Sequence, residues 1–166
     1  MKIGYACICL DAQFHFETCI QKFATEDRLR SIIRANLETL QKLLEYNAGH
    51  NIRMYRLSFD LIPFGSSPVN TIPWLDEFAA QFQSLGDYVR KNNMRVSLHP
   101  GQYCVINSPR EDVVERSIDE LLYHASILEA MGLDATHKMV LHVGGIYGDK
   151  QQAMQRFARV YRRLDP

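Results

Sequence analysis

The chain has 166 residues, of which 46% are hydrophobic and 23% are charged, a composition typical of one globular domain with a sizeable apolar core. Basic and acidic residues number 19 each, so the net charge is zero and the overall basic excess of many duplex-DNA binders is excluded, which leaves only a local basic face for such contacts. Four dispersed cysteines without a CxxC pair favour reduced thiols over disulfides or a zinc site, and no apolar run could span a membrane, so we expect a soluble, cytoplasmic protein.

Short apolar runs alternate with amphipathic segments, beginning with a buried strand expected at residues 3–9. Thr25 is suited to cap a helix that runs from residue 26 to about residue 47. The apolar positions of this helix recur at helical spacing and predict its buried face: Leu29, Ile32, Ile33, Leu37, Leu40, Leu43 and Leu44. Residues 54–58 then predict a second strand. Residues 74–90 predict a second helix, whose inward side chains are expected to be Leu75, Phe78, Phe82, Leu85 and Val89.

The second half of the chain repeats this pattern, with a third strand expected at residues 96–98. Ser108, followed by Pro109 and Glu111, predicts the N-cap and first turn of a third helix that ends near Gly132. Its expected buried side chains are Val114, Ile118, Leu121, Leu122, Ala125 and Leu128. The pattern closes with a fourth strand at residues 139–141 and a fourth helix at residues 153–164, introduced by Asp149.

Four consecutive βα units predict an α/β fold with a parallel sheet and right-handed crossovers. A doubly wound sheet and a (β/α)₈ TIM barrel both begin in this way. The barrel is favoured because polar and aromatic residues cluster after the expected strand ends, and because no glycine-rich phosphate loop follows the first strand. We therefore expect residues 1–166 to form a single domain that comprises about the first four units of a TIM-type barrel, or half of it.

Two histidines occupy the expected carboxyl ends of neighbouring strands: His99, before a Pro-Gly turn, and His142, before Gly144 and Gly145. Since parallel strands lie about 4.8 Å apart, the two imidazoles should be roughly 5–7 Å apart, a span that one metal ion or two adjacent ions can bridge. Each histidine could instead hold its turn by hydrogen bonding, but the pairing favours metal binding. The remaining histidines are expected at the surface or in packing roles: His15, His50, His124 and His137.

Gln102 and Tyr103 form an amide–aromatic pair at the tip of the predicted Pro-Gly turn. A protruding aromatic ring can stack on nucleobases or wedge between base steps, and an amide can hydrogen-bond a base edge. The alternative is a tyrosine that folds back on its own loop. Basic residues such as Arg56 and Lys150 could contact phosphates, although scattered basic residues more often form a solvated surface.

Several segments occur together in an order that resembles the UV-damage endonuclease family, whose members are relatives of endonuclease IV among the xylose-isomerase-like barrels. The segments are GY at residues 4–5, YR at 55–56, LIPF at 61–64, HPGQY at 99–103, SP at 108–109, HVGG at 142–145 and YGDK at 147–150. The resemblance covers nearly the whole chain and corresponds to the N-terminal half of the family's barrel.

The resemblance implies a metal-dependent DNA repair endonuclease that nicks damaged double-stranded DNA on the 5′ side of pyrimidine dimers and 6-4 photoproducts. Metal-assisted phosphodiester hydrolysis would use divalent ions, often manganese, with zinc or magnesium as alternatives. In the family pattern His99 and His142 correspond to metal ligands. The residues expected to contact the DNA or its lesion are Gln102, Tyr103, Tyr5, Lys150 and Arg56.

This chain departs from the family pattern at two positions: Ser67 stands where a histidine is common, and Cys9 where an asparagine is common. The carboxylate ligands of the family come from later strands, so we expect weak metal binding, little catalysis by this chain alone, and self-association through open sheet edges. Two alternatives remain. One is a sugar isomerase or epimerase on the same barrel, against which an exposed Gln102–Tyr103 pair argues, and the other is a non-catalytic protein that binds distorted DNA.

Overall fold

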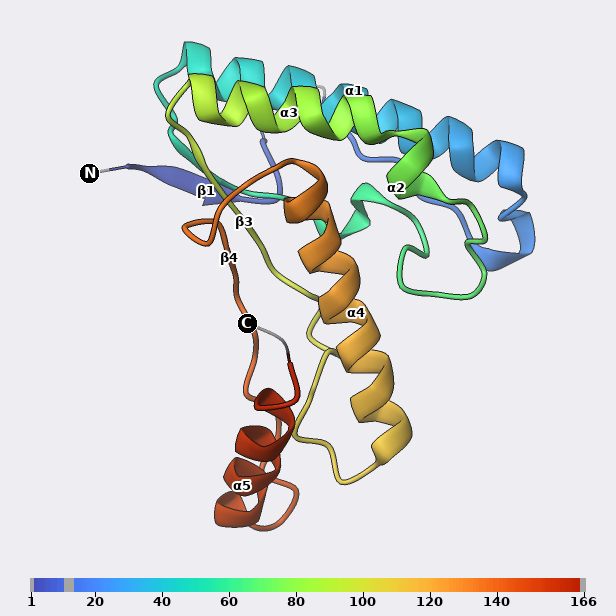
Figure 1. The fold of residues 1–166 in the computed structure, drawn as a ribbon, viewed down its shortest axis with the longest axis vertical. Helices are drawn as coiled ribbons and strands as arrows, with labels where there is room; N and C mark the ends of the chain where they lie inside the picture. Colours follow the sequence, from blue (N-terminus) through green and yellow to red (C-terminus); the bar gives the residue numbers. More distant parts are fainter. Residues whose placement is uncertain (1, 11–13, 165–166) are drawn as a thin grey trace.

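A computed structural model describes residues 2–10 and 14–164 and shows a four-stranded parallel sheet with helices packed over one face (Figure 1). Burial alternates along the strands: Tyr55, Val96 and Leu98 are fully buried beneath the helices, whereas Arg56 and Ser97 on the opposite face are only partly covered. The elements, in chain order, are β1 (Gly4–Ala6), a 3₁₀ turn (Gln21–Phe23), α1 (Glu26–Gly49), β2 (Met54–Arg56), a second 3₁₀ turn (Phe59–Leu61), α2 (Trp74–Glu77), α3 (Ala79–Lys91), β3 (Arg95–Leu98), α4 (Glu111–Ala130), β4 (Lys138–Met139) and α5 (Lys150–Tyr161).

The strands lie in the order β1-β2-β3-β4, each parallel to its neighbour. The chain therefore adds each βα unit in the same direction, as in a barrel, whereas a doubly wound sheet reverses its direction of growth at a switch point. The α/β class and the parallel sheet are confirmed. Closure into an eight-stranded barrel stays a prediction.

The first helix forms as its sequence predicts. The hydroxyl oxygen of Thr25 accepts a hydrogen bond from the Arg28 amide at 3.4 Å, and Glu26 and Asp27 lie in the first turn, where the helix dipole favours negative charge. The whole predicted stripe is buried: Leu29, Ile32, Ile33, Leu37, Leu40, Leu43 and Leu44. This face packs against the buried side of the sheet to form the main core.

Two side chains predicted to be buried are exposed: Leu75 is 39% and Leu122 55% accessible, so these two predictions were wrong. The expected helix at 74–90 breaks at Phe78, whose backbone (φ −112°, ψ 16°) leaves the helical region and turns α2 away from α3. In α4, Leu121 and Leu122 are adjacent apolar residues on different sides of the helix. Leu121 is on the packed side with Ile127 and is buried, whereas Leu122 is on the other side and is exposed.

Several element boundaries differ from the predictions for local reasons. The first strand ends at Ala6 because Cys7 adopts a left-handed backbone (φ 59°). Ser108 is not the N-cap of α4: Arg110 occupies that position, and the Ser108 hydroxyl accepts a hydrogen bond from the Arg110 amide at 3.1 Å in the preceding turn. Helix α5 begins at Lys150, three residues earlier than expected, because the Asp149 carboxylate caps the amide of Gln152.

A second, smaller core joins α5 to the lower part of α4 (Figure 1). Its buried members are Cys104, Ile106, Val114, Leu121 and Val160. All four cysteines are free thiols. Within the described ranges, none of the helices combines the length and the apolar character needed to cross a membrane.

Candidate functional site

His99 and His142 meet at the carboxyl ends of neighbouring strands. His99 directly follows β3, and the Val140 amide extends the β3–β4 pairing by donating to the Leu98 carbonyl at 2.9 Å. The two imidazole centroids lie 4.6 Å apart with an interplanar angle of 78°. Neither ring forms a hydrogen bond with another described residue, so the nitrogens of both imidazoles remain free to bind a ligand. The separation is slightly shorter than the strand spacing predicts.

The electrostatic surroundings favour neutral His99. Partial burial lowers the pKa of His99, and the nearby His142 and Arg56 lower it further. The neutral imidazole is the form that binds metal ions. Arg56 lies on the same open face of the sheet, and its Nε is buried without a hydrogen-bond partner. An anion beside the histidine pair would therefore meet an unsatisfied basic group.

The described residues supply only part of a metal site. No group of three or more His, Cys, Asp or Glu side chains within residues 2–10 and 14–164 is arranged to hold an ion. Of the two acidic residues near strand ends, Asp149 is engaged with Gln152 as the cap of α5, and the pKa of half-buried Asp60 is raised by burial. The donor chemistry of His99 and His142 fits a divalent ion as two ligands of a larger set.

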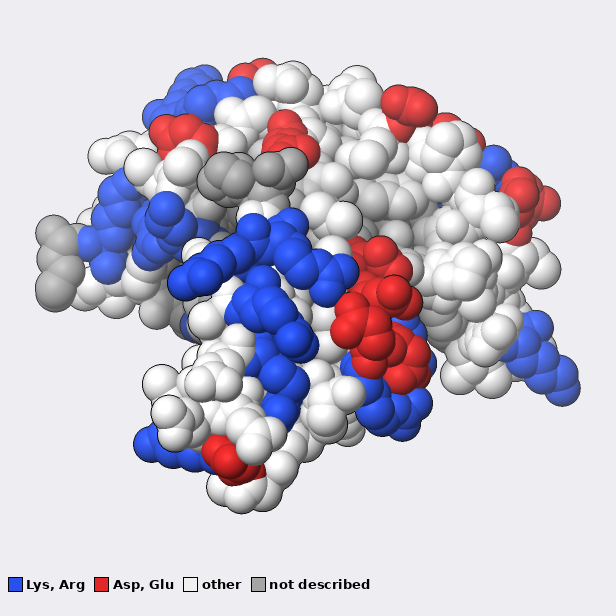
Figure 2. All heavy atoms as spheres, turned by 60° about the horizontal axis from the view of Figure 1, so that its bottom comes forward, with Lys and Arg blue, Asp and Glu red and all other residues white. Residues whose placement is uncertain are grey.

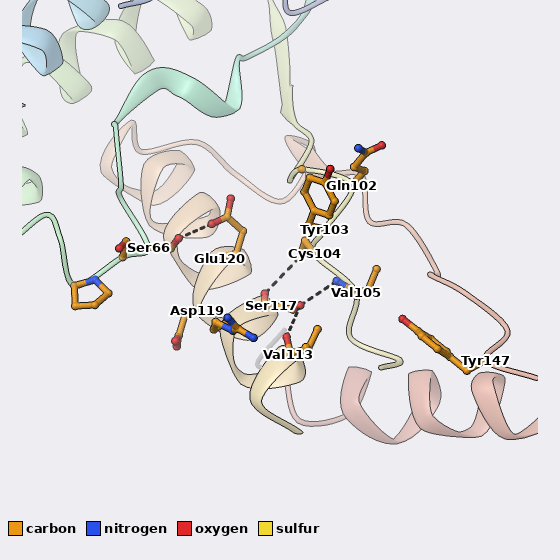
Figure 3. A pocket seen from close by; sticks show the side chains of 14 residues that line it. Ser66, Gln102, Tyr103, Cys104, Val105, Val113, Ser117, Asp119, Glu120 and Tyr147 are labelled. Atoms are coloured by element: carbon orange, nitrogen blue, oxygen red, sulfur yellow. Dashed lines mark hydrogen bonds between the residues drawn. The ribbon is translucent and has the colours of Figure 1, made fainter. Parts of the chain in front are cut away.

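Gln102 and Tyr103 are the two central residues of a hydrogen-bonded turn. The Cys104 amide donates to the Gly101 carbonyl at 2.9 Å and closes the turn. The turn is anchored to α4, because the Cys104 thiol contacts the Ser117 carbonyl at 3.4 Å and the Val105 amide donates to the Ser117 hydroxyl at 3.0 Å. Figure 3 shows Gln102 and Tyr103 projecting beyond these anchors. Tyr103 is 84% exposed, so it does not fold back on its loop.

A cavity of about 840 Å³ lies beside this turn (Figure 3). Its walls come from four segments: residues 66–68 after β2, residues 101–105 after β3, residues 113–120 of α4, and Tyr147 in the loop after β4. Ser67, where the family commonly has histidine, belongs to the first wall. The cavity therefore brings together the loops after three consecutive strands, although it does not include the histidine pair.

Glu120 of α4 links the first wall of the cavity to a buried histidine. Its carboxylate accepts hydrogen bonds from the Ser66 hydroxyl and, at 3.1 Å, from His124. The hydrogen bond from His124 is the main cause that holds the pKa of Glu120 below its usual value, with Ser66 adding to it. This network was not predicted from the sequence, although the i, i+4 spacing of Glu120 and His124 on one helix was a usable signal.

The structure does not bring Tyr5 together with the other predicted contacts. Its ring packs on Tyr55 with centroids 5.2 Å apart, and its hydroxyl donates to Asn47 of α1 at 2.8 Å. Burial raises the pKa of Tyr5, and the adjacent Cys9 thiol adds to this effect. Tyr5 therefore lies toward the helix-covered face of the sheet.

Basic side chains gather locally despite the zero net charge. Figure 2, which turns the lower end of Figure 1 toward the reader, shows a band of Lys and Arg side chains beside an acidic patch. The lower end carries α5, which begins with exposed Lys150, one of the predicted contacts. Helix α5 and the residues after it contribute further basic groups at Arg156, Arg159, Arg162 and Arg163.

Comparison with known proteins gives consistent matches. A family model described as UV-endonuclease UvdE matches residues 1–166. The UV DNA damage endonuclease of Clostridium perfringens is 42% identical over 166 residues, which cover 99% of this chain and 40% of that protein. The enzyme of the same name from Bacillus cereus strain B4264 is 32% identical over 87% of this chain and 46% of its own length.

A crystal structure of SacUVDE superposes with a TM-score of 0.94 at 35% sequence identity. The match covers 99% of this chain and 57% of that chain. This chain thus spans about half the length of the proteins that it matches.

Proposed function

Because the chain belongs to the UV-endonuclease UvdE family, we propose that it acts in DNA repair as part of an endonuclease that nicks damaged double-stranded DNA on the 5′ side of UV photoproducts. One observation carries the proposal: two unpaired imidazoles at neighbouring strand ends lie in the same loop region as an exposed amide–aromatic turn. The relatives' names support DNA damage as the trigger of the reaction.

In this proposal His99 and His142 hold a divalent ion, with manganese as the first candidate and zinc or magnesium as alternatives. The ion, when bound, would activate water and stabilise the leaving oxygen during attack on phosphorus. Arg56 supplies positive charge beside the pair and is placed to attract the phosphate. Lys150, exposed at the start of α5, adds a sequence-neutral contact to the DNA backbone.

Gln102 and Tyr103 are proposed to enter the duplex at the lesion. A damaged pair is already poorly stacked, so displacing it costs less than the few kcal/mol that a normal base requires. Readout by deformability needs no base-specific contact, which suits a turn with only two projecting side chains. Tyr5, the remaining predicted contact, packs on Tyr55 and Asn47 and is not part of this projecting turn. The exposed Tyr103 ring also argues against a closed polyol pocket of a sugar isomerase or epimerase.

We also propose that the sheet belongs to a closed (β/α)₈ barrel and that, alone, this chain self-associates. In the described part of the chain, β1 and β4 are each paired on one side only, and Ile8 and Val143 close to these edges are exposed. Sedimentation velocity over a range of concentrations tests this point. A monodisperse monomer at every concentration would contradict self-association.

A second candidate function is recognition of distorted DNA without hydrolysis. The observation that favours it is that, among the described residues, the two neighbouring imidazoles have no third His, Cys, Asp or Glu grouped with them to hold an ion. Damage recognition through Gln102 and Tyr103 would then operate without the ion.

Incision of a duplex that carries a single 6-4 photoproduct separates these functions. The parent chain, His142→Ala and the control His50→Ala are compared with and without manganese, since His50 lies at the distant C-terminus of α1. Manganese-dependent incision that only His142→Ala abolishes supports the endonuclease. Damage-selective binding without incision supports the recognition function, and the absence of both overturns the proposal.

A further inference from the structure

The loop that carries His142 has little structure of its own. Residues 140–149 connect β4 to α5 without regular secondary structure. Between its two ends, the described hydrogen bonds attach this loop to the rest of the molecule at one point, where the Asn107 side-chain amide donates to the Gly145 carbonyl at 2.9 Å. Asn107 belongs to the loop between β3 and α4, which also carries the Gln102–Tyr103 turn.

Asn107 is itself held firmly. Its side chain is 1% exposed, and its backbone carbonyl accepts a hydrogen bond from the Arg156 Nε at 2.9 Å. The Arg156 guanidinium lies over the ring of Tyr147, 5.6 Å from its centroid, and so joins α5 to the same loop. The amide of Asn107 is therefore a fixed point against which the His142 loop can be placed.

The backbone of the loop is fitted closely around this amide. Gly144 has φ +93°, a conformation that residues with a side chain rarely adopt, and a Cβ at this position would collide with Asn107 Oδ1. That oxygen is buried and accepts no hydrogen bond, so the one described bond of the side chain is its donation to Gly145. The fit and the bond both hold the segment that directly follows His142.

We propose that Asn107 is a positioning residue that sets the imidazole of His142 against that of His99. It joins the loop after β3 to the loop after β4, so one amide fixes the relative placement of both. The proposal rests on the proposed function for its purpose, which is to keep two metal ligands together. The geometric claim can be tested without any metal.

The test is the magnetisation transfer (NOE) between ring protons of His99 and His142, measured by NMR on the metal-free chain with labelled histidine. The centroid distance of 4.6 Å predicts a cross-peak in the parent. Asn107→Leu keeps a side chain of similar size but removes the donor, and it should lose the cross-peak. Gly144→Ala, which forces a Cβ into the Asn107 amide, should lose it as well. Manganese affinity should fall by roughly 10–100-fold, as for other groups that orient metal ligands.

Asn36→Leu is the matched control. Asn36 is also fully buried, and its amide donates to the carbonyls of Glu17, Asp60 and Leu61, which fixes loops away from the histidines. Because its side chain makes more hydrogen bonds than that of Asn107, this variant should be destabilised at least as much and yet keep the cross-peak. Loss of the cross-peak in both variants would overturn the specific role of Asn107, because it would then reflect general loosening.

The experiment distinguishes failure of the positioning role of Asn107 from failure of the proposed metal binding by His99 and His142. An unchanged cross-peak in Asn107→Leu overturns the inference even if the parent binds manganese through the two histidines. A cross-peak lost in Asn107→Leu and in Gly144→Ala supports the inference even if the parent binds no manganese, and in that case the proposed metal function fails instead.

Discussion

His99 and His142 touch edge to face, with ring centroids 4.6 Å apart, although they belong to different βα loops. The contact follows from the sheet: Leu98 pairs with Met139 in parallel register, so the residues that follow both strands emerge at the same edge. The relationship explains why two residues so distant in the chain can serve one site. Both histidines should therefore be substituted, one at a time, when the site is tested.

His99→Ala and His142→Ala should weaken manganese binding to a similar extent. Both are proposed ligands of the same ion, so each loss should cost at least about tenfold in affinity, since even groups that only support a ligand contribute this much. Titration followed by electron paramagnetic resonance of free manganese measures the effect. His50→Ala is the control, because its ring stacks on Tyr46 and hydrogen-bonds the Tyr46 carbonyl at the end of α1, away from the proposed site. Binding by His142→Ala as tight as that of the parent would refute the assignment.

Features that depend on local periodicity were predictable from the sequence. The stripe of α1, its Thr25 cap and the four parallel strands all follow from the spacing of apolar residues and from local capping chemistry. The adjacency of His99 and His142 also follows, because consecutive parallel strands place their ends together.

Features that depend on distant contacts were not predictable. Nothing local distinguishes Leu121 from Leu122, and only packing in the second core, beside Ile106 and Val160, decides which is buried. The contacts of Glu120 with Ser66 and of Asn107 with Gly145 join residues 54 and 38 positions apart. Such pairs require knowledge of how the loops are placed, which a single sequence does not provide.

Tyr103→Ala should weaken binding to a lesion-containing duplex and leave the stability of the protein unchanged. Stacking of one base on an aromatic ring contributes about 1–3 kcal/mol, which corresponds to a loss of roughly 5–150-fold in affinity. The ring is 84% exposed, so the free energy of unfolding should stay within about 0.5 kcal/mol of the parent. Fluorescence anisotropy with damaged and undamaged duplexes measures the effect, with exposed Tyr161→Ala as control. Equal binding by parent and Tyr103→Ala would contradict the wedge.

Gly86→Ala should destabilise the fold, against the usual trend for helices. Alanine in place of glycine inside a helix normally stabilises by roughly 0.5–1 kcal/mol. At Gly86 in α3, however, a Cβ would collide with the carbonyl oxygen of Met131 at the end of α4, and overpacking of this kind costs about 1–3 kcal/mol or more. Gly49→Ala is the control, since a Cβ at this last residue of α1 meets nothing within 4 Å. Urea denaturation should show a lower free energy of unfolding for Gly86→Ala and no loss for Gly49→Ala.

Glu120→Gln should lower the free energy of unfolding at neutral pH, and the difference from the parent should largely disappear in acid. The pKa of the Glu120 carboxyl is held below its usual value of 4.5 by hydrogen bonds from His124 and Ser66. A lowered pKa in the folded state contributes stability that is fully present above the unfolded value and is lost as the pH falls through the folded one. Hydrogen bonds to a charged group typically contribute about 1.5–3 kcal/mol, and partial exposure of Glu120 places the expected loss near the lower end.

The measurement is urea denaturation of the parent and of Glu120→Gln at pH 7 and at about pH 3. Glu115→Gln is a substitution of the same kind at an exposed position of the same helix, and it should leave the free energy of unfolding unchanged at both pH values. A difference between parent and Glu120→Gln that is as large in acid as at pH 7 would show that the charge of Glu120 is not the source of the stability. Ser66 lies in the cavity wall beside the Gln102–Tyr103 turn, and Glu120→Gln weakens its contact with α4. The backbone amide hydrogens of residues 66–67 should therefore exchange with solvent faster in this variant than in the parent. Such a result would link the Glu120 network to the mobility of the proposed DNA-binding surface.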